Sequence, residues 1–273
     1  MLRNFSNSRT LGDNIKLGAL TAFTAGTINI ASLIIFLNFT SNVTGHYAIL
    51  SNELSKGNWS QAFIVAGWIF LFFFGGFLSN FIVININKKS QYLAHALPIF
   101  LEILCLLFVG IYGQNYYKNT LPETQFLVAL MLFATGLQNG LTASISNFSV
   151  KTTHLTGTTT DLGILFSMFT QKEYRKNPAL IGRAKLLLSI MIAYVAGAVF
   201  SGLTYYHLEF TVFYIICFCL LIVIGYDFYK INIRHFQTQY RYHRIYNKPT
   251  ILAVIYFKFY EKRKQKTKLA FED

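Results

Sequence analysis

Charged residues are scarce in this sequence. Asp, Glu, Lys and Arg make up 13% of its 273 residues, whereas hydrophobic residues make up 53%. A soluble domain usually carries about 25% charged residues, because its surface must interact with water. The scarcity of charge therefore disfavours a soluble protein and indicates an integral membrane protein.

Motifs for catalysis and metal binding are also missing. The three cysteines, Cys105, Cys217 and Cys219, lie inside apolar runs without metal-ligand spacing or the pattern of a disulfide framework. The sequence has no Gly-Lys phosphate-binding loop, no G-x-S-x-G and no H-E-x-x-H. We therefore expect no metal, no cofactor and no enzymatic activity. An intramembrane enzyme would need a second catalytic group beside Glu102 or Asp161.

Acidic residues are fewer than basic ones, 11 against 24, and the formal net charge is +13. A nucleic-acid-binding protein would gather its basic residues on one folded face. Here they cluster at the ends of apolar segments and in the C-terminal region. We therefore expect no nucleic-acid partner and interpret the basic residues as a signal of membrane topology.

Long apolar segments fill most of the chain. A helix needs about 20 apolar residues to cross a bilayer, and six segments meet this requirement. The predicted spans are 17–38, 60–86, 93–113, 124–149, 181–206 and 208–230. The first span follows a short basic head, as a signal peptide would, but its apolar core is too long and lacks an obvious cleavage site. We interpret it as a retained transmembrane helix.

The basic residues fall almost entirely on one side of these six spans. The side that holds both termini receives 22 Lys and Arg residues, and the other side receives Lys56 and Lys118. Without the tail the count is still 11 against 2. Because basic loops stay in the cytoplasm, we expect a multi-pass protein of the bacterial inner membrane with both termini cytoplasmic.

This topology divides the chain into three parts. They are a cytoplasmic head at 1–16, a transmembrane domain at 17–230 and a basic cytoplasmic tail at 231–273. Residues 250–260 are apolar but too few to span, and a basic run follows them. A helix lying on anionic inner-leaflet lipid fits this pattern, and a solvated basic tail fits it equally well.

A Thr-Gly segment occurs twice. Residues 40–45 (TSNVTG) align without a gap on residues 152–157 (TTHLTG), an offset of 112. Further matches are Gly26 with Gly136 and Asn29 with Asn139 at an offset of 110, and GGFLS at 75–79 with GAVFS at 197–201. The same order of features in both halves indicates an internal duplication.

The duplication has a consequence for function. The first span runs outward and the fourth runs inward, so repeats at about 17–113 and 124–230 must be inverted with respect to each other. Inverted repeats occur in many secondary transporters. The fold that we expect is therefore an all-α membrane protein, in which six transmembrane helices form two inverted three-helix repeats with short broken half-helices.

The Thr-Gly segments suit a binding site. Glycine lets the backbone approach a ligand, and a half-helix beginning after each segment, at 46–56 and 158–170, would present free amides to a polar or anionic solute. An ordinary turn at the membrane interface is the alternative. The candidate substrate-binding residues are Asn29, Thr40, Thr44, Gly45, Gly136, Gln138, Asn139, Thr153, Thr156, Gly157 and Asp161.

Polar residues inside the spans leave two interpretations open. The mid-span amides of Asn29, Gln138 and Asn139 could line a pathway or join helices by hydrogen bonds. Glu102 is the carboxylate near the middle of a span and is a candidate for proton coupling, or else it is protonated or paired with Lys88 or Lys89. Asp161 could complement the half-helix dipole or join a cation site.

Four motifs resemble the YoaK family of bacterial inner-membrane proteins, a domain of unknown function. They are GTIN at 26–29, TSNVTGH at 40–46, GLQNG at 136–140 and TTHLTGTTTDLG at 152–163. The resemblance covers about residues 15–230 and implies a bacterial membrane location. This chain departs from the family at Asn29, where Asp is usual, and at His46, where Asn is usual.

We therefore expect a small secondary transporter or permease of an unknown small solute, embedded in the lipid bilayer. The alternative is a membrane scaffold or sensor that does not transport and acts through its basic tail.

Overall fold

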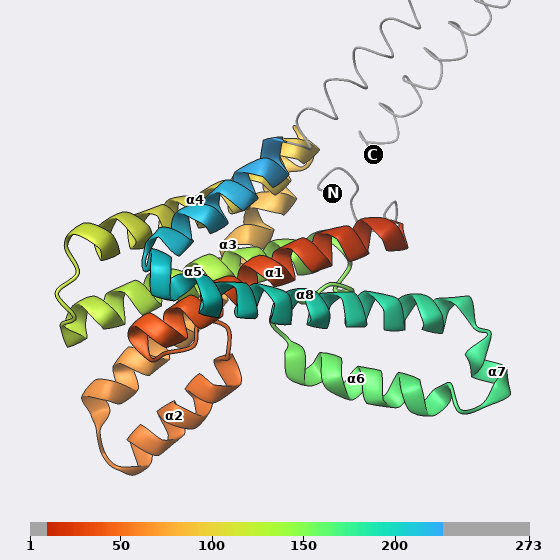
Figure 1. Ribbon diagram of the computed structural model, residues 1–273, viewed down its shortest axis with the longest axis horizontal. Helices are drawn as coiled ribbons and strands as arrows, with labels where there is room; N and C mark the ends of the chain where they lie inside the picture. Colours follow the sequence, from red (N-terminus) through yellow and green to blue (C-terminus); the bar gives the residue numbers. More distant parts are fainter. Residues whose placement is uncertain (1–9, 226–273) are drawn as a thin grey trace, which may run out of the picture. The chain divides into compact units, whose positions relative to one another are not determined.

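The computed structural model describes residues 10–225, and the regular elements in this range are α-helices (Figure 1). The all-α fold is therefore confirmed for the described part of the chain. The predictions for the head before residue 10 and for the tail lie outside it.

The helices follow one another through short loops. They are α1 (Leu11–Phe36), α2 (Val43–Ser55), α3 (Trp59–Ile86), α4 (Gln91–Asn115), α5 (Leu121–Ile145), α6 (Leu155–Met168), α7 (Lys172–Arg175) and α8 (Pro178–Leu208). A last helix, Thr211–Gly225, ends the described range.

Five of these helices, α1, α3, α4, α5 and α8, are long and apolar enough to cross a membrane. They coincide with the first five predicted spans, which supports an integral membrane protein. The sixth predicted span corresponds to the helix Thr211–Gly225, which belongs to the shorter apolar helices. A sixth crossing therefore stays a prediction.

Polar residues mark where several helices begin. Thr10 and Asp13 form a capping box at the start of α1, and Thr120 and Glu123 form another at the start of α5. Asn177 accepts hydrogen bonds from the first amides of α8. Such caps satisfy amides that have no partner within the helix, so these helix starts are fixed by local sequence.

Two pairs of long helices cross at very close range. In the first pair, a Cβ atom on Gly26 of α1 would overlap with the carbonyl oxygen of Tyr194 in α8. A Cβ atom on Gly197 of α8 would overlap with the carbonyl oxygen of Phe23 in α1. The contact is therefore reciprocal, with each glycine receiving the backbone of the other helix. Close approach of this kind is typical of helix pairs in membranes.

The pair formed by α3 and α5 has the same arrangement. A Cβ atom on Gly75 would overlap with the carbonyl oxygen of Phe133, and one on Gly136 would overlap with that of Phe72. In both pairs the glycine lies three residues after the residue whose carbonyl oxygen contacts the partner glycine. The sequence offsets of 110 and 122 that align the glycines therefore also align the carbonyl groups.

The short helices lie beside the long ones, α2 against α3 and α6 against α8 (Figure 1). The main hydrophobic core joins α4 and α5 to α1, α3 and the helix Thr211–Gly225. There, a Cβ atom on Gly113 of α4 would overlap with the ring of Phe210.

The glycine crossings generate a stability prediction. Gly197→Ala should destabilise the protein by about 1–3 kcal/mol, because the added methyl group has no space against the Phe23 carbonyl. Gly202→Ala in the same helix is the control, since nothing lies within 4 Å of a Cβ atom there. It should be neutral or stabilising by up to about 1 kcal/mol. The measurement is thermal unfolding of the purified protein in lipid nanodiscs.

The same comparison applies to α3, with Gly75→Ala as the test and Gly67→Ala as the control, where a Cβ atom would again meet open space. Equal effects of test and control in both helices would contradict the assignment of the two crossings.

Candidate functional site

The chain turns back on itself after α1. Leu37 adopts a left-handed conformation with φ of 54° and ends the helix. The following residues return along α1 as far as Asn29, whose Oδ1 accepts hydrogen bonds from the amides of Thr40 (2.9 Å) and Ser41 (3.1 Å). Asn29 lies seven residues before the end of α1, which corresponds to about 10 Å of helix. α2 therefore begins well inside the end of α1.

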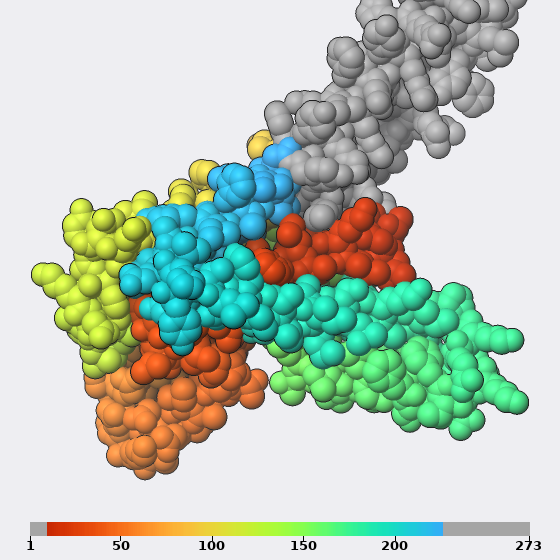
Figure 2. Space-filling model, viewed as in Figure 1, coloured from red at the N-terminus to blue at the C-terminus, as the bar shows by residue number. Residues whose placement is uncertain are grey.

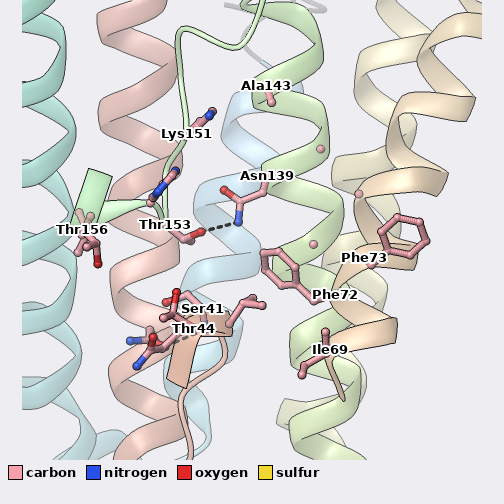
Figure 3. Close-up of a pocket in the computed structure, with 18 of the residues that line it drawn as sticks. Ser41, Thr44, Ile69, Phe72, Phe73, Asn139, Ala143, Lys151, Thr153 and Thr156 are labelled. Atoms are coloured by element: carbon pink, nitrogen blue, oxygen red, sulfur yellow. Dashed lines mark hydrogen bonds between the residues drawn. The ribbon is translucent and has the colours of Figure 1, made fainter. Parts of the chain in front are cut away.

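A second turn follows α5 and also returns to an asparagine of its own helix. Asn147 and Phe148 have positive φ angles of 51° and 58°, and the chain then returns to Asn139. The Oδ1 atom of Asn139 accepts a hydrogen bond from the hydroxyl of Thr152 (2.8 Å), and its Nδ2 donates one to the hydroxyl of Thr153 (2.7 Å; Figure 3). Each Thr-Gly segment is thus held by an asparagine, and the sequence alignment pairs these two asparagines with each other.

The two glycines have a different role from the one expected. The short helices begin at Val43 and Leu155, so Gly45 and Gly157 lie in their first turns and not before them. A Cβ atom on Gly45 would lie 2.7 Å from Nδ2 of Asn42, and one on Gly157 would lie 2.8 Å from Nε2 of His154. The glycines therefore leave room for the residue that precedes each helix.

Both Thr-Gly segments line one cavity with a volume of about 820 Å³. Its polar side is formed by the two segments, with Ser41 and Thr44 on one and Thr153 and Thr156 on the other (Figure 3). Its apolar side is formed by α3, from which Phe72 reaches toward the segments. The molecular surface is indented between α2 and α6 (Figure 2). A mixed lining of this kind and volume is typical of a small-molecule site.

The structure divides the predicted site residues into two groups. Those that line the cavity are Asn29, Thr44, Gly136, Asn139, Thr153 and Thr156. Those that are not among its lining residues are Thr40, Gly45, Gln138, Gly157 and Asp161. Thr40 instead has its carbonyl group bonded by Thr135 of α5 (2.8 Å). It therefore joins the first turn to α5.

Asp161 lies on α6 and forms an ion pair with Arg183 of α8, with 2.8 Å between Oδ2 and Nη2. Both side chains are substantially exposed, so the pair contributes little stability. Asp161 lines a second cavity of about 690 Å³, which Gly157 also lines. Within the described chain, Asp161 therefore pairs with a basic residue, away from the first cavity.

Glu102 lies in a buried polar cluster between α1, α4 and α5. Gln138 donates from Nε2 to Glu102 Oε1 (2.9 Å) and to the hydroxyl of Thr24 (2.7 Å). The partner of Glu102 is thus Gln138, and within residues 10–225 neither Lys88 nor Lys89 forms an ion pair with it. The second oxygen of Glu102 and the amide oxygen of Gln138 have no hydrogen-bond partner among the described residues. This cluster is separate from the cavity lining.

The cavity residues that the sequence did not single out as site residues include Tyr194 and Lys151. The hydroxyl of Tyr194 accepts a hydrogen bond from Asn29 Nδ2 (2.8 Å) and lies 3.3 Å from the hydroxyl of Ser41. The polar hydroxyl of Tyr194 inside an apolar span was the available signal. Lys151 was counted only as a topology signal, yet it lines the cavity between the turn and Thr153.

His46 secures the start of α2. Its Nε2 atom bonds to the carbonyl oxygen of Phe39 (2.8 Å), and its ring meets the edge of Trp68. Burial lowers the pKa of His46, and the hydrogen bond to Phe39 opposes this effect only in part. Because the unfolded chain takes up the proton more easily, His46 reduces stability as the pH falls below the unfolded value of about 6.5. His46 therefore favours this arrangement at neutral pH.

A family model described as "Protein of unknown function (DUF1275)" matches residues 17–226. No curated protein and no solved structure matches the chain.

The asparagine anchors can be tested by substitution. Asn29→Ala leaves the buried amide of Thr40 and the partly buried amide of Ser41 without an acceptor, at a cost of about 1–3 kcal/mol for a fully buried amide. The amides of Thr40 and Ser41 should then exchange with deuterium much faster. Asn29→Asp keeps an acceptor for both amides and should preserve most of their protection.

Asn85→Ala is the control, because Asn85 is exposed and bonds only within α3. If the amides at 40 and 41 stay equally protected in Asn29→Ala, another group holds the turn and the anchor is wrongly assigned.

Proposed function

Since the chain belongs to the DUF1275 family of unknown function, which includes the YoaK proteins, we propose a function from the geometry of the site. The protein is a small secondary transporter. It moves an unidentified small solute through the membrane by alternating access of two inverted three-helix repeats.

One observation carries this proposal, namely that both Thr-Gly segments line the same cavity. An ordinary interfacial turn after α1 and another after α5 would lie apart, because nothing would draw them to a common space. Here Asn29 and Asn139 each draw a turn back along its own helix. Non-helical backbone inside a membrane protein is tolerated where it is buried in protein or lines a cavity. A transport site at this cavity would explain why both turns lie there.

The cavity lining supports the inverted repeat. Six pairs of lining residues are related by the sequence offsets of 110 and 112. In each pair, one residue comes from the first half of the chain and the other from the second half. The pairs are Asn29 and Asn139, Phe39 and Lys151, Ser41 and Thr153, Asn42 and His154, Val43 and Leu155, and Thr44 and Thr156. Equivalent residues gather around one point when the axis that relates the halves passes through it. The cavity therefore lies at the interface of the proposed repeats, where transporters of this kind bind solute.

The direction of the helices agrees with this symmetry. Gln138 of α5 contacts Thr24 of α1, whereas Thr135 contacts Thr40, which is bonded to Asn29 further along α1. Residue numbers thus rise along α1 while they fall along α5, so the two helices are antiparallel. Inverted repeats require this arrangement of their first helices.

The glycine crossings suggest which parts would move. α1 and α8 form one tightly crossed pair, and α3 and α5 form the other. Backbone contact leaves little freedom within a pair, so we expect each pair to move as one body. Each pair combines the first span of one repeat with the second span of the other. Rocking of one pair against the other would then open the cavity to alternate sides.

Glu102 is the proposed proton-coupling residue. It is fully buried and contacts Gln138, which is next to the cavity residue Asn139 in α5. A change in its proton would alter the hydrogen bonds that join α4 to α5 and, through Thr24, to α1. Because α1 and α5 belong to different crossed pairs, the proton on Glu102 acts where these pairs meet.

We further propose that the protein lies in the bacterial inner membrane with both termini in the cytoplasm. The count of 11 basic residues against 2, made without the tail, supports this orientation. Under it, α2 approaches the cavity from the outer side and α6 approaches from the cytoplasmic side.

Alternating access can be tested before a solute is known. The native cysteines are replaced by alanine, and single cysteines are placed at Thr44 and Thr156, which line the cavity. We expect a membrane-impermeant maleimide to label both positions from either side of the membrane, in intact cells and in inverted vesicles. Lys56→Cys and Lys176→Cys are the controls, and each should be labelled from one side only.

A scaffold with two separate turns gives the opposite pattern, with Thr44→Cys labelled only from outside and Thr156→Cys only from inside. That result would end the transport proposal. Deletion of residues 231–273 tests the alternative of a tail-dependent scaffold, since the transporter should keep its labelling pattern without them.

The coupling role predicts a pH effect. In the cysteine variants, the ratio of labelling from the two sides should change with pH, because the proton on Glu102 shifts the balance between states. Glu102→Gln imitates the protonated side chain and should remove this dependence. The Lys56→Cys control corrects for the reactivity of the thiol itself. A Glu102→Gln variant with the wild-type pH response would assign coupling to another group.

A further inference from the structure

The first cavity contains one charged side chain. Among its described lining residues Lys151 is the single Lys, Arg, Asp or Glu. Lys151 forms no hydrogen bond or ion pair within residues 10–225. Lys151 is exposed, so water solvates its charge when the cavity is empty, and a negatively charged solute that enters the cavity would be attracted to it.

The second cavity leads to the same residue. Its charged lining residues are Lys151, Asp161 and Arg183, and the last two form an ion pair with each other. Their charges cancel, which again leaves Lys151. Both cavities therefore have one net positive charge, and it is the same charge.

The two cavities adjoin at one short segment. Phe148, Lys151 and His154 line both of them. Phe148 holds a left-handed backbone with φ of 58° and is 70% exposed. The segment 148–154 therefore borders both cavities, with Lys151 at its middle.

The backbone adds to the positive potential of the first cavity. The amides of Val43 and Thr44 at the start of α2 have no hydrogen-bond partner among the described residues. The same is true of the amides of Leu155 and Thr156 at the start of α6. All four residues line the cavity, and free amides at helix starts attract anions.

The cavity lining differs between equivalent positions of the two halves, and this difference indicates the chemistry of the uncharged end of the solute. The position equivalent to Lys151 in the first half is Phe39, and both line the cavity. Ile69 and Phe72 of α3 extend the apolar side. Pseudo-symmetric positions thus offer a cation at one end and an aromatic ring at the other.

We propose that the two cavities form a single route for a small organic anion with an apolar body, such as an aromatic carboxylate, and that Lys151 selects its negative charge. This inference rests on the proposed transport function and adds the class of solute.

The test measures the electrostatic potential in the cavity by chemical modification. Thr156→Cys and Thr44→Cys, without the native cysteines, react in nanodiscs with two methanethiosulfonates of opposite charge, one carrying a sulfonate and one a trimethylammonium group. The anionic reagent should be favoured at both positions relative to the exposed control Lys56→Cys. Lys151→Gln should lower this preference by about tenfold, since one unit charge acts on both reagents in opposite directions.

Two further variants show whether the effect comes from the positive charge at position 151 or from the net charge of the protein. Lys151→Arg keeps the charge and should keep the preference. Lys185→Gln removes an exposed lysine that lines neither cavity and should have little effect. Both lysines are exposed, so we expect neither substitution to disturb folding.

Competition then tests the solute class with three probes that share one ring, namely benzoate, benzamide and benzylamine. Benzoate should slow modification of Thr156→Cys, and this protection should disappear in Lys151→Gln. Protection by benzylamine instead, or no protection by benzoate, would overturn the inference, even where the two-sided labelling supports a transporter. Conversely, protection by benzoate with one-sided labelling would leave an anion-binding protein that does not transport.

Discussion

A chain segment that leaves its helix inside a membrane needs hydrogen-bond partners for its polar groups, and in the described structure two asparagines supply them. Asn29 and Asn139 each bond a segment of chain that has left its helix. Without a partner at this depth the turns would move outward to water. The cavity, the positions of both short helices and the exposure of their first amides all follow from these two anchors.

The glycine crossings supply the rigid frame for these anchors. Gly26 lies three residues before Asn29, and Gly136 lies three residues before Asn139. Residues three apart share a helix face, so each crossing and its anchor point toward the same region. The partner helix contributes as well, since the carbonyl group of Tyr194 lies against Gly26 and its hydroxyl accepts a hydrogen bond from Asn29 Nδ2. The close packing at Gly26 and the hydrogen bond of Asn29 therefore hold the same residue, Tyr194, in place.

Much of this fold could be predicted from the sequence, because apolar length and duplicated motifs are local properties. The first five spans and the pairing of Asn29 with Asn139 are of this kind. The predicted starts of the short helices, at residues 46 and 158, lie three residues after the observed starts at Val43 and Leu155. The Thr-Gly pattern is typical of a turn, but here it forms the first helical turn. Gln138 was assigned to the site, but its side chain faces Glu102. Side-chain direction in a span depends on neighbouring helices, and a single sequence does not contain that information.

The differences between the two halves carry as much meaning as their likeness. Asn29 bonds backbone amides, whereas Asn139 bonds threonine hydroxyls. Duplicated halves with identical linings would offer the same chemistry at both ends and suit a symmetric solute. A pair such as Phe39 and Lys151 breaks that equality at equivalent positions of one cavity. A solute with unlike ends would therefore bind in one orientation, although the glycine crossings and the asparagine anchors are alike in the two halves.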